Sequence, residues 1–206
     1  MLTKNQVTAL VIVVLVLWVA VSVVQGESRP QHVFASLSYV VTGTSFVLLL
    51  FDRWLWRSRI FRPWLTMRPI LLGTWKGELR SNYPNPEAWV SSGPIEVYLV
   101  IRQTFSSIDV RLFSLESESI SLSANILNTA PELHTLFVVY RNEPRGLLLE
   151  KSPIHYGGMR LQVRGERVER LDGHYWTDRL TKGEAEFTTH IKKTSLDFNN
   201  AASSFH

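Results

Sequence analysis

The sequence predicts a membrane α-hairpin of two transmembrane helices followed by an all-β domain, an eight-stranded antiparallel up-and-down β-barrel. Two long apolar runs without charge lie within the first 51 residues. From residue 73 onward the helical period disappears, and short alternating runs separated by turn residues take over. We therefore divide the chain into a two-helix hairpin (1–51), an Arg/Trp-rich juxtamembrane neck (52–69), the barrel (70–194) and a flexible tail (195–206).

The two apolar runs, residues 7–24 and 33–51, are each long enough to cross a bilayer as a helix. They contain 18 and 19 residues and no charged side chain, and a hydrocarbon core of about 30 Å needs roughly 17–25 residues. A cleaved signal peptide is an alternative for the first run, but such apolar regions span only about 7–15 residues. Two buried core helices of a soluble protein are a further alternative, which the near-total lack of polar residues disfavours.

The charges beside the hairpin predict its orientation. Residues 52–69 carry five arginines and one acid, whereas the turn at residues 25–32 has one arginine and one acid. Because Lys and Arg accumulate on the cytoplasmic side of short flanks, both termini and the barrel are expected in the cytoplasm. Trp54, Trp56 and Trp64 interleave with these arginines, as expected at headgroup depth, and the arginines also suit anionic lipid.

Eight segments after the neck have the alternation of half-buried strands. In the first, Trp75, Gly77 and Leu79 alternate with charged residues. A closed barrel of eight strands leaves no exposed edge and has room for one small ligand, whereas a two-sheet sandwich is the alternative. Residues 82–94 contain three prolines and are expected to form an irregular loop. The predicted strands are 73–81, 94–104, 107–114, 117–127, 133–141, 155–164, 167–176 and 183–191.

The composition and the motifs exclude several function classes. Residues 1–69 have a net charge of +5 and residues 70–206 of −1, so the pI of 9.5 does not indicate a duplex nucleic-acid binder. The chain has no cysteine, and its six histidines show no metal-ligand spacing. There is no phosphate-binding glycine loop and no nucleophile elbow. Asp172 and His174 are ordinary same-side neighbours of a strand, so we predict no catalytic residue, no metal and no cofactor.

The densest group of chemically active side chains lies around the last predicted hairpin, at residues 173–183. Aromatic faces stack on bases, arginine binds phosphate in a bidentate manner, and hydroxyls bond phosphate oxygens. A merely stable hairpin, with aromatic packing and an Asp–Arg turn pair, is the alternative. The predicted ligand-binding residues are Trp176, Thr177, Arg179 and Lys182 in this hairpin, with Arg80, Tyr83, Tyr140 and Arg160 as weaker candidates.

The whole layout resembles one family. Two N-terminal apolar runs, an Arg-rich neck, LLGTWKGELRS at residues 71–81 and DGHYWTDRLTKGEAEF at residues 172–187 are similar to the two-transmembrane β-barrel effectors of bacterial CBASS anti-phage systems, the SMODS-associated 2TM β-strand-rich effectors. The GTW at residues 73–75 is also similar to lipocalins and fatty-acid-binding proteins, in which a tryptophan plugs the barrel floor.

The resemblance implies a membrane effector in the bacterial inner membrane. A cognate nucleotidyltransferase would make a cyclic oligonucleotide, most simply a cyclic dinucleotide, and the cytosolic barrel would bind it. The hairpins would then form a homo-oligomer that disrupts the lipid bilayer and kills the cell. Small and hydroxylic residues on the second helix suit such helix–helix contacts. A membrane-tethered lipocalin-like carrier of an apolar ligand, expected if the barrel interior is uniformly apolar, and a structural membrane adaptor are the alternatives.

Overall fold

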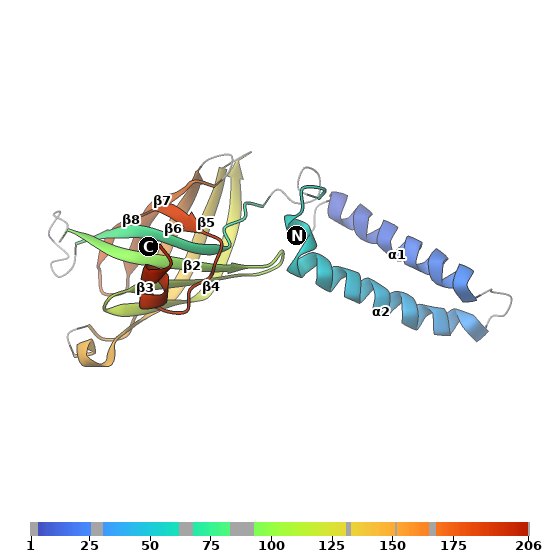
Figure 1. Ribbon diagram of the computed structural model, residues 1–206, viewed down its shortest axis with the longest axis horizontal. Coiled ribbons are helices and arrows are strands. Elements are labelled where there is room, and N and C mark those ends of the chain that lie inside the picture. The colour runs from blue at the N-terminus through green and yellow to red at the C-terminus, as the bar shows by residue number, and fades with distance from the viewer. Residues whose placement is uncertain are drawn as a thin grey trace. The chain divides into compact units, whose positions relative to one another are not determined.

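The computed structural model describes residues 4–25, 31–61, 68–82, 93–130, 133–150, 152–164 and 168–205. The chain divides into two compact units, Met1–Met67 and Arg68–His206. The first unit is helical and the second is almost entirely strand, and Figure 1 shows the elements of each.

The helical unit consists of α1 (Lys4–Gln25), α2 (Gln31–Arg53) and a short 3₁₀ helix, η1 (Leu55–Arg57). The two long helices pack on each other, and a Cβ added to Gly43 would lie 3.5 Å from a Leu17 methyl group, so the glycine permits a close approach. Within the described residues, one helix segment, Asn5–Val24, is long and apolar enough to span a membrane, with a mean hydropathy of 3.0. The second predicted span, residues 33–51, lies in α2 and stays a prediction.

The two described neck tryptophans differ in exposure. Trp54 is exposed, whereas Trp56 is fully buried. Phe51 and Phe61 close this region with an edge-to-face contact, their ring centroids 5.6 Å apart. Trp64 lies outside the described residues.

The second unit is a closed antiparallel barrel in which each strand pairs with the next and β8 pairs with β1. The predicted barrel is therefore confirmed and the sandwich alternative is wrong, while nothing in the geometry tests the lipocalin-like part of the prediction. The strands are β1 (Gly73–Ser81), β2 (Pro94–Gln103), β3 (Ile108–Ser114), β4 (Ser117–Ala130), β5 (Leu133–Pro144), β6 (His155–Arg164), β7 (Arg170–Thr177) and β8 (Lys182–Ile191), with a 3₁₀ helix η2 (Gly146–Leu148) after β5.

Apolar side chains fill the barrel towards the end where β1 begins. Trp75 is fully buried, donates its indole N–H to the Leu71 carbonyl at 2.9 Å, and stacks on His190 with ring centroids 4.2 Å apart. Each fully buried large side chain contributes about 1.5–3 kcal/mol of hydrophobic stabilisation, so this packed end is the stable base of the barrel. Its other fully buried members include Leu99, Ile101, Leu136, Leu161, Leu171 and Phe187.

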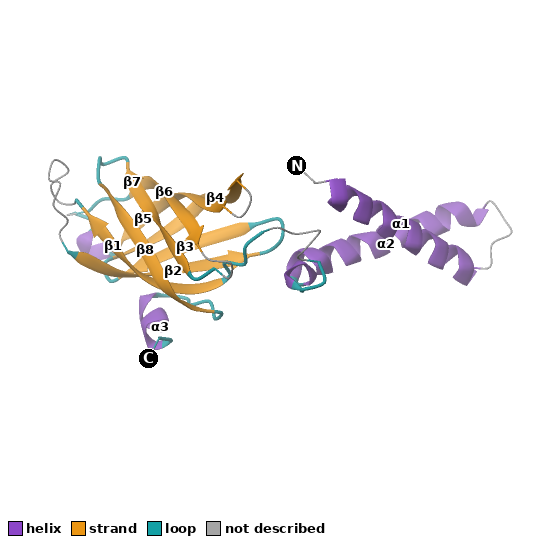
Figure 2. Ribbon diagram, turned by 90° about the horizontal axis from the view of Figure 1, so that it is seen from above, coloured by secondary structure: helices purple, strands orange, loops and turns teal. Residues whose placement is uncertain are grey.

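The prediction of a flexible tail is wrong for residues 195–205, because this segment folds back on the barrel. Residues Phe198–Ser203 form a helix, α3, capped by the Asp197 carboxylate, which accepts a hydrogen bond from the Asn200 N–H at 2.8 Å. Ala201 is fully buried, and the Phe198 ring meets the Tyr98 ring edge-on. Figure 2 shows α3 beside β2 on the outer face of the barrel. The barrel residues beneath the tail are Tyr98, Val100 and Phe113.

Candidate functional site

Strand alternation separates the residues of the predicted closing-hairpin site. Trp176 and Thr177 are neighbours on β7, but the Trp176 side chain is 46% exposed and the Thr177 side chain only 8%. The Trp176 ring lies over Gly158 on the outer surface, where an added Cβ would come within 2.4 Å of the ring. Because successive side chains of a strand point to opposite faces, these two residues cannot line the same side of the barrel wall.

Three further predicted residues also lie on the outside. Arg80 and Lys182 are exposed at the strand ends that meet beside the last hairpin. Arg160 projects outward, with its guanidinium carbon 6.0 Å from the Phe137 ring centroid. The structure therefore places these three residues and Trp176 on the outer face of the barrel, and their role in ligand binding stays a prediction. Tyr83 lies outside the described residues.

The remaining described candidates, Tyr140, Thr177 and Arg179, lie at the barrel end opposite Trp75. Two residues that were not predicted, His155 and Tyr175, lie there as well. We call these five residues the mouth cluster: Tyr140, His155, Tyr175, Thr177 and Arg179. The four strand residues are each 6–8% exposed. Arg179, in the turn after β7, donates from Nη1 to the Ser152 hydroxyl at 3.1 Å, and its Nη2 lies 3.4 Å from His155 Nε2. Thr177 shares a hydrogen bond with the Thr181 hydroxyl, which fixes the turn that carries Arg179.

Burial sets the protonation states in the mouth cluster. Burial, followed by the nearby Tyr175 and Asp178, raises the pKa of Tyr140 far above its usual value, and the Arg179 charge opposes this only in part. Burial likewise raises the pKa of the Tyr175 phenol. Burial lowers the pKa of His155. At neutral pH the cluster therefore presents two neutral phenols and a neutral imidazole beside the positive Arg179.

A wall of small polar side chains adjoins the mouth cluster. Asn142, which faces His155 across the β5–β6 pair, donates from Nδ2 to the hydroxyls of Ser117 at 3.0 Å and Ser119 at 2.8 Å. Ser119 is 4% exposed. The barrel interior is thus apolar at one end and lined by hydroxyl, phenol, amide and guanidinium groups at the other, which disfavours an apolar-ligand carrier.

His155, Tyr175 and the serine–asparagine wall are not among the site residues that the sequence predicts. None of these residues belongs to a local motif. The signal that would have found them is strand parity: His155 shares its face of β6 with the core residues Met159 and Leu161, and Tyr175 shares its face of β7 with Leu171. Reading the inward positions of all eight strands in register would have grouped them with Thr177.

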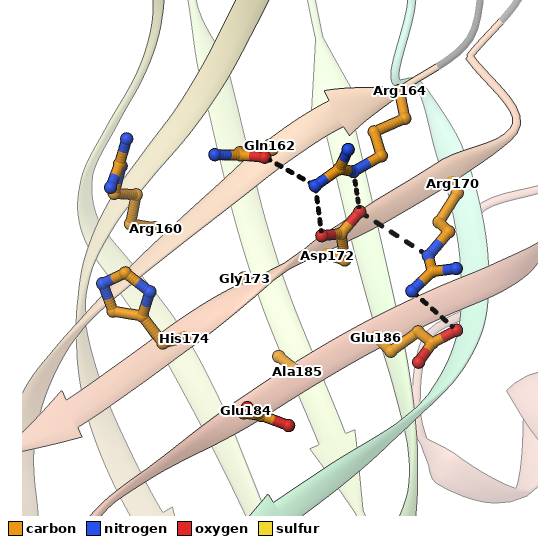
Figure 3. A pocket seen from close by; sticks show the side chains of 10 residues that line it. All are labelled: Arg160, Gln162, Arg164, Arg170, Asp172, Gly173, His174, Glu184, Ala185 and Glu186. Carbon is orange, nitrogen blue, oxygen red and sulfur yellow. Dashed lines mark hydrogen bonds and ion pairs between the residues drawn. The ribbon is translucent and has the colours of Figure 1, made fainter.

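A groove of about 430 Å³ lies on the outer face of β6, β7 and β8. Figure 3 shows its charged side chains arranged across these strands. Arg164 donates to both carboxylate oxygens of Asp172, and Arg170 bridges Asp172 and Glu186. Two guanidinium groups are therefore already engaged by carboxylates, and Glu184 and Glu186 would repel an added phosphate. The groove is for this reason a poorer anion site than the mouth cluster.

The part of the chain that the structure describes contains no candidate metal-binding site. There, no group of three His, Asp or Glu side chains is arranged to hold a metal ion. The charged outer groove is organised by ion pairs, and the mouth cluster offers one imidazole and no carboxylate among its five members.

Comparison with known proteins identifies the barrel. Residues 66–189 match the family described as Cap15, cyclic dinucleotide receptor domain. A protein of Staphylococcus schleiferi named CD-NTase-associated protein 15 is 32% identical over 148 residues, which cover 72% of this chain and 75% of that protein. The protein of the same name from Escherichia albertii is 25% identical over 159 residues, covering 74% and 76%. The resemblance to CBASS effectors is therefore confirmed, and the chain belongs to the Cap15 cyclic dinucleotide receptor family.

Proposed function

We propose that the chain is a CBASS effector that binds a cyclic dinucleotide at the mouth cluster and acts on the bacterial inner membrane through its helical unit. The observation that carries this proposal is the mouth cluster itself: a guanidinium, an imidazole, two phenols and a hydroxyl wall at one end of a barrel whose other end is packed with apolar side chains. The nucleotide would come from a cognate nucleotidyltransferase, as the name of the curated relatives suggests.

The chemistry of the mouth cluster suits both parts of a cyclic dinucleotide. Arg179 can give a phosphate oxygen charge-assisted hydrogen bonds. The phenols of Tyr140 and Tyr175 stay neutral donors at cellular pH, because burial raises the pKa of each. The wall formed by Asn142 and the serines offers donors and acceptors to base edges or ribose hydroxyls. We infer that this combination, rather than a single motif, selects the ligand.

The helical unit supplies the proposed output. No residue of the Asn5–Val24 segment is buried within the chain, and α2 also exposes large apolar side chains such as Phe46 and Leu49. Exposed apolar surface on this scale needs lipid or a partner. The arginines of the neck favour cytoplasmic termini, which would place the barrel where the nucleotide is made. We propose that α1 and α2 both cross the membrane and assemble into a homo-oligomer when the barrel is occupied.

A ligand can drive this assembly only if it binds the assembled form more tightly. Moving a two-state equilibrium from 1:99 to 99:1 needs about 10⁴-fold preference. An oligomer accumulates a modest preference over several binding events, so a membrane-disrupting assembly can switch more sharply than one subunit.

Calorimetry on the full chain in detergent micelles tests the ligand. The panel is cyclic di-AMP, cyclic di-GMP, cyclic GMP-AMP and cyclic UMP-AMP, with the linear dinucleotides as controls. Saturable binding of at least one cyclic member is expected, with weaker binding of its linear form. If no nucleotide binds while circular dichroism shows an intact β fold, the receptor role is wrong, and the structural membrane adaptor becomes the better interpretation.

A chimera tests the output. Residues 1–51 are replaced by an unrelated two-helix anchor, and the chimera is co-expressed with a cyclic dinucleotide synthase while dye entry into the cells is followed. Loss of dye entry, with the barrel still binding nucleotide, is expected. A chimera that permeabilises cells as fast as the native chain would show that the native helices serve only as an anchor.

A further inference from the structure

Two basic side chains of the mouth cluster, His155 and Arg179, lie close together. His155 is the first residue of β6 and Arg179 lies in the β7–β8 turn, yet the histidine Nε2 and the arginine Nη2 are 3.4 Å apart. The His155 side chain is only 7% exposed. The His155 imidazole and the Arg179 guanidinium, which are both cations when protonated, are thus held together where little water reaches the imidazole.

The hydrogen bonds assign the imidazole tautomer. His155 Nδ1 lies 3.0 Å from the Pro153 carbonyl oxygen, which can only accept a hydrogen bond, so Nδ1 carries the proton. The guanidinium of Arg179 can only donate, so Nε2 of the neutral ring is the acceptor. In the ligand-free chain, Arg179 therefore uses one of its donors on a neutral His155.

The surroundings keep this imidazole neutral without an external anion. Burial is the largest influence on the pKa of His155 and lowers it; the Pro153 carbonyl raises it, the Arg179 charge lowers it and the Asp178 carboxylate raises it. On β5, Asn142 faces His155 across the β5–β6 strand pair. The neutral phenol of Tyr140, also on β5, lies close enough for the Arg179 charge to affect its pKa. An anion added between His155 and Arg179 would reverse the balance, because it attracts a second positive charge.

We propose that His155 and Arg179 together grip a phosphodiester of the bound nucleotide, and that His155 takes up one proton from solvent as the ligand binds. The Nε2 atom changes from acceptor to donor: the proton bonds to Nε2, the ring becomes an imidazolium, and its N–H donates to a phosphate oxygen. Arg179 then turns the donor it had used on Nε2 to the same anion. This inference rests on the proposed function and adds pH dependence to it.

Proton uptake during binding is directly measurable. Calorimetry of the full chain in micelles, at about pH 7 in two buffers of different ionisation enthalpy, is expected to give different apparent binding enthalpies for whichever panel nucleotide binds. The affinity is expected to rise as the pH falls across about pH 8 to 6, by at most about tenfold per pH unit for one proton. His155→Gln keeps a polar side chain but cannot protonate, so its affinity should lose this pH dependence.

His174→Gln is the matched control, because His174 lies exposed on the outer face of the neighbouring strand β7. It should keep the wild-type proton uptake. Should His155→Gln fail to fold, NMR titration of the imidazole carbons in the unmodified chain, with and without nucleotide, reports the same quantity, since the pKa of His155 must rise on binding. Binding without proton uptake would overturn this inference and leave the receptor role intact, whereas the absence of binding at every pH would overturn both.

Discussion

Arg179→Ala gives the sharpest test of the mouth cluster as the nucleotide site. In the free chain the Arg179 guanidinium bonds the Ser152 hydroxyl at 3.1 Å and approaches His155 Nε2 at 3.4 Å, so it is already positioned by neutral partners. A hydrogen bond from a charged group is worth about 1.5–3 kcal/mol, and its loss should raise the Kd of the nucleotide about 10- to 150-fold. Loss of the neutral contact to Ser152 affects the free chain as well, so the effect is expected towards the lower end.

Arg160→Ala is the matched control for this experiment. Arg160 has the same charge and lines the outer groove of β6–β8, with its guanidinium over Phe137 on the outer surface. Calorimetry should give a Kd within about twofold of the wild type for this variant, with equal melting temperatures for the two variants. Unchanged binding in Arg179→Ala, or an equal loss in Arg160→Ala, would refute the assignment of the site to the mouth and point to the outer groove.

Three further changes test the fold. In Gly173→Ala, the new Cβ would lie against the Arg160 carbonyl oxygen, so the free energy of unfolding in urea should fall by about 1–3 kcal/mol. Gly146→Ala is the control and should be near neutral, because no atom lies within 4 Å of its new Cβ. Equal effects of the two substitutions would show that the strand backbones accommodate the methyl group. Ala201→Asp places a carboxylate at a fully buried site of α3 and should free the tail, which limited proteolysis would detect as cleavage after β8. Burial lowers the pKa of three barrel histidines below 6.5, so the unfolded chain binds more protons than the folded chain as the pH falls. The melting temperature should therefore be highest above about pH 6.5 and should decrease as the pH drops below it. A melting temperature that stays constant below about pH 6.5 would contradict the burial of these imidazole rings. These histidines are His134, His155 and His190.

The sequence by itself determined the helical hairpin, the eight strands and the family. These features are local: an uncharged run predicts a helix in lipid, and alternation predicts a strand with one buried face, whatever the strand later pairs with. Residues 73–81 and 155–164 were predicted with the bounds that β1 and β6 have. Closure followed because eight such strands in succession leave no edge exposed only if the last one meets the first.

The tertiary structure alone decided which side chains share a site. Trp176 and Thr177 are adjacent in sequence and separated by the barrel wall, whereas His155 and Arg179 are 24 residues apart and meet at the rim. The six-residue helix α3 is too short to be stable by its own hydrogen bonds and exists because Ala201 and Phe198 pack against the outer face of β2. Alternation tells which residues of one strand face the same way. The register of all the strands together decides which of those faces is covered. It also decides at which end of the barrel the polar side chains come together.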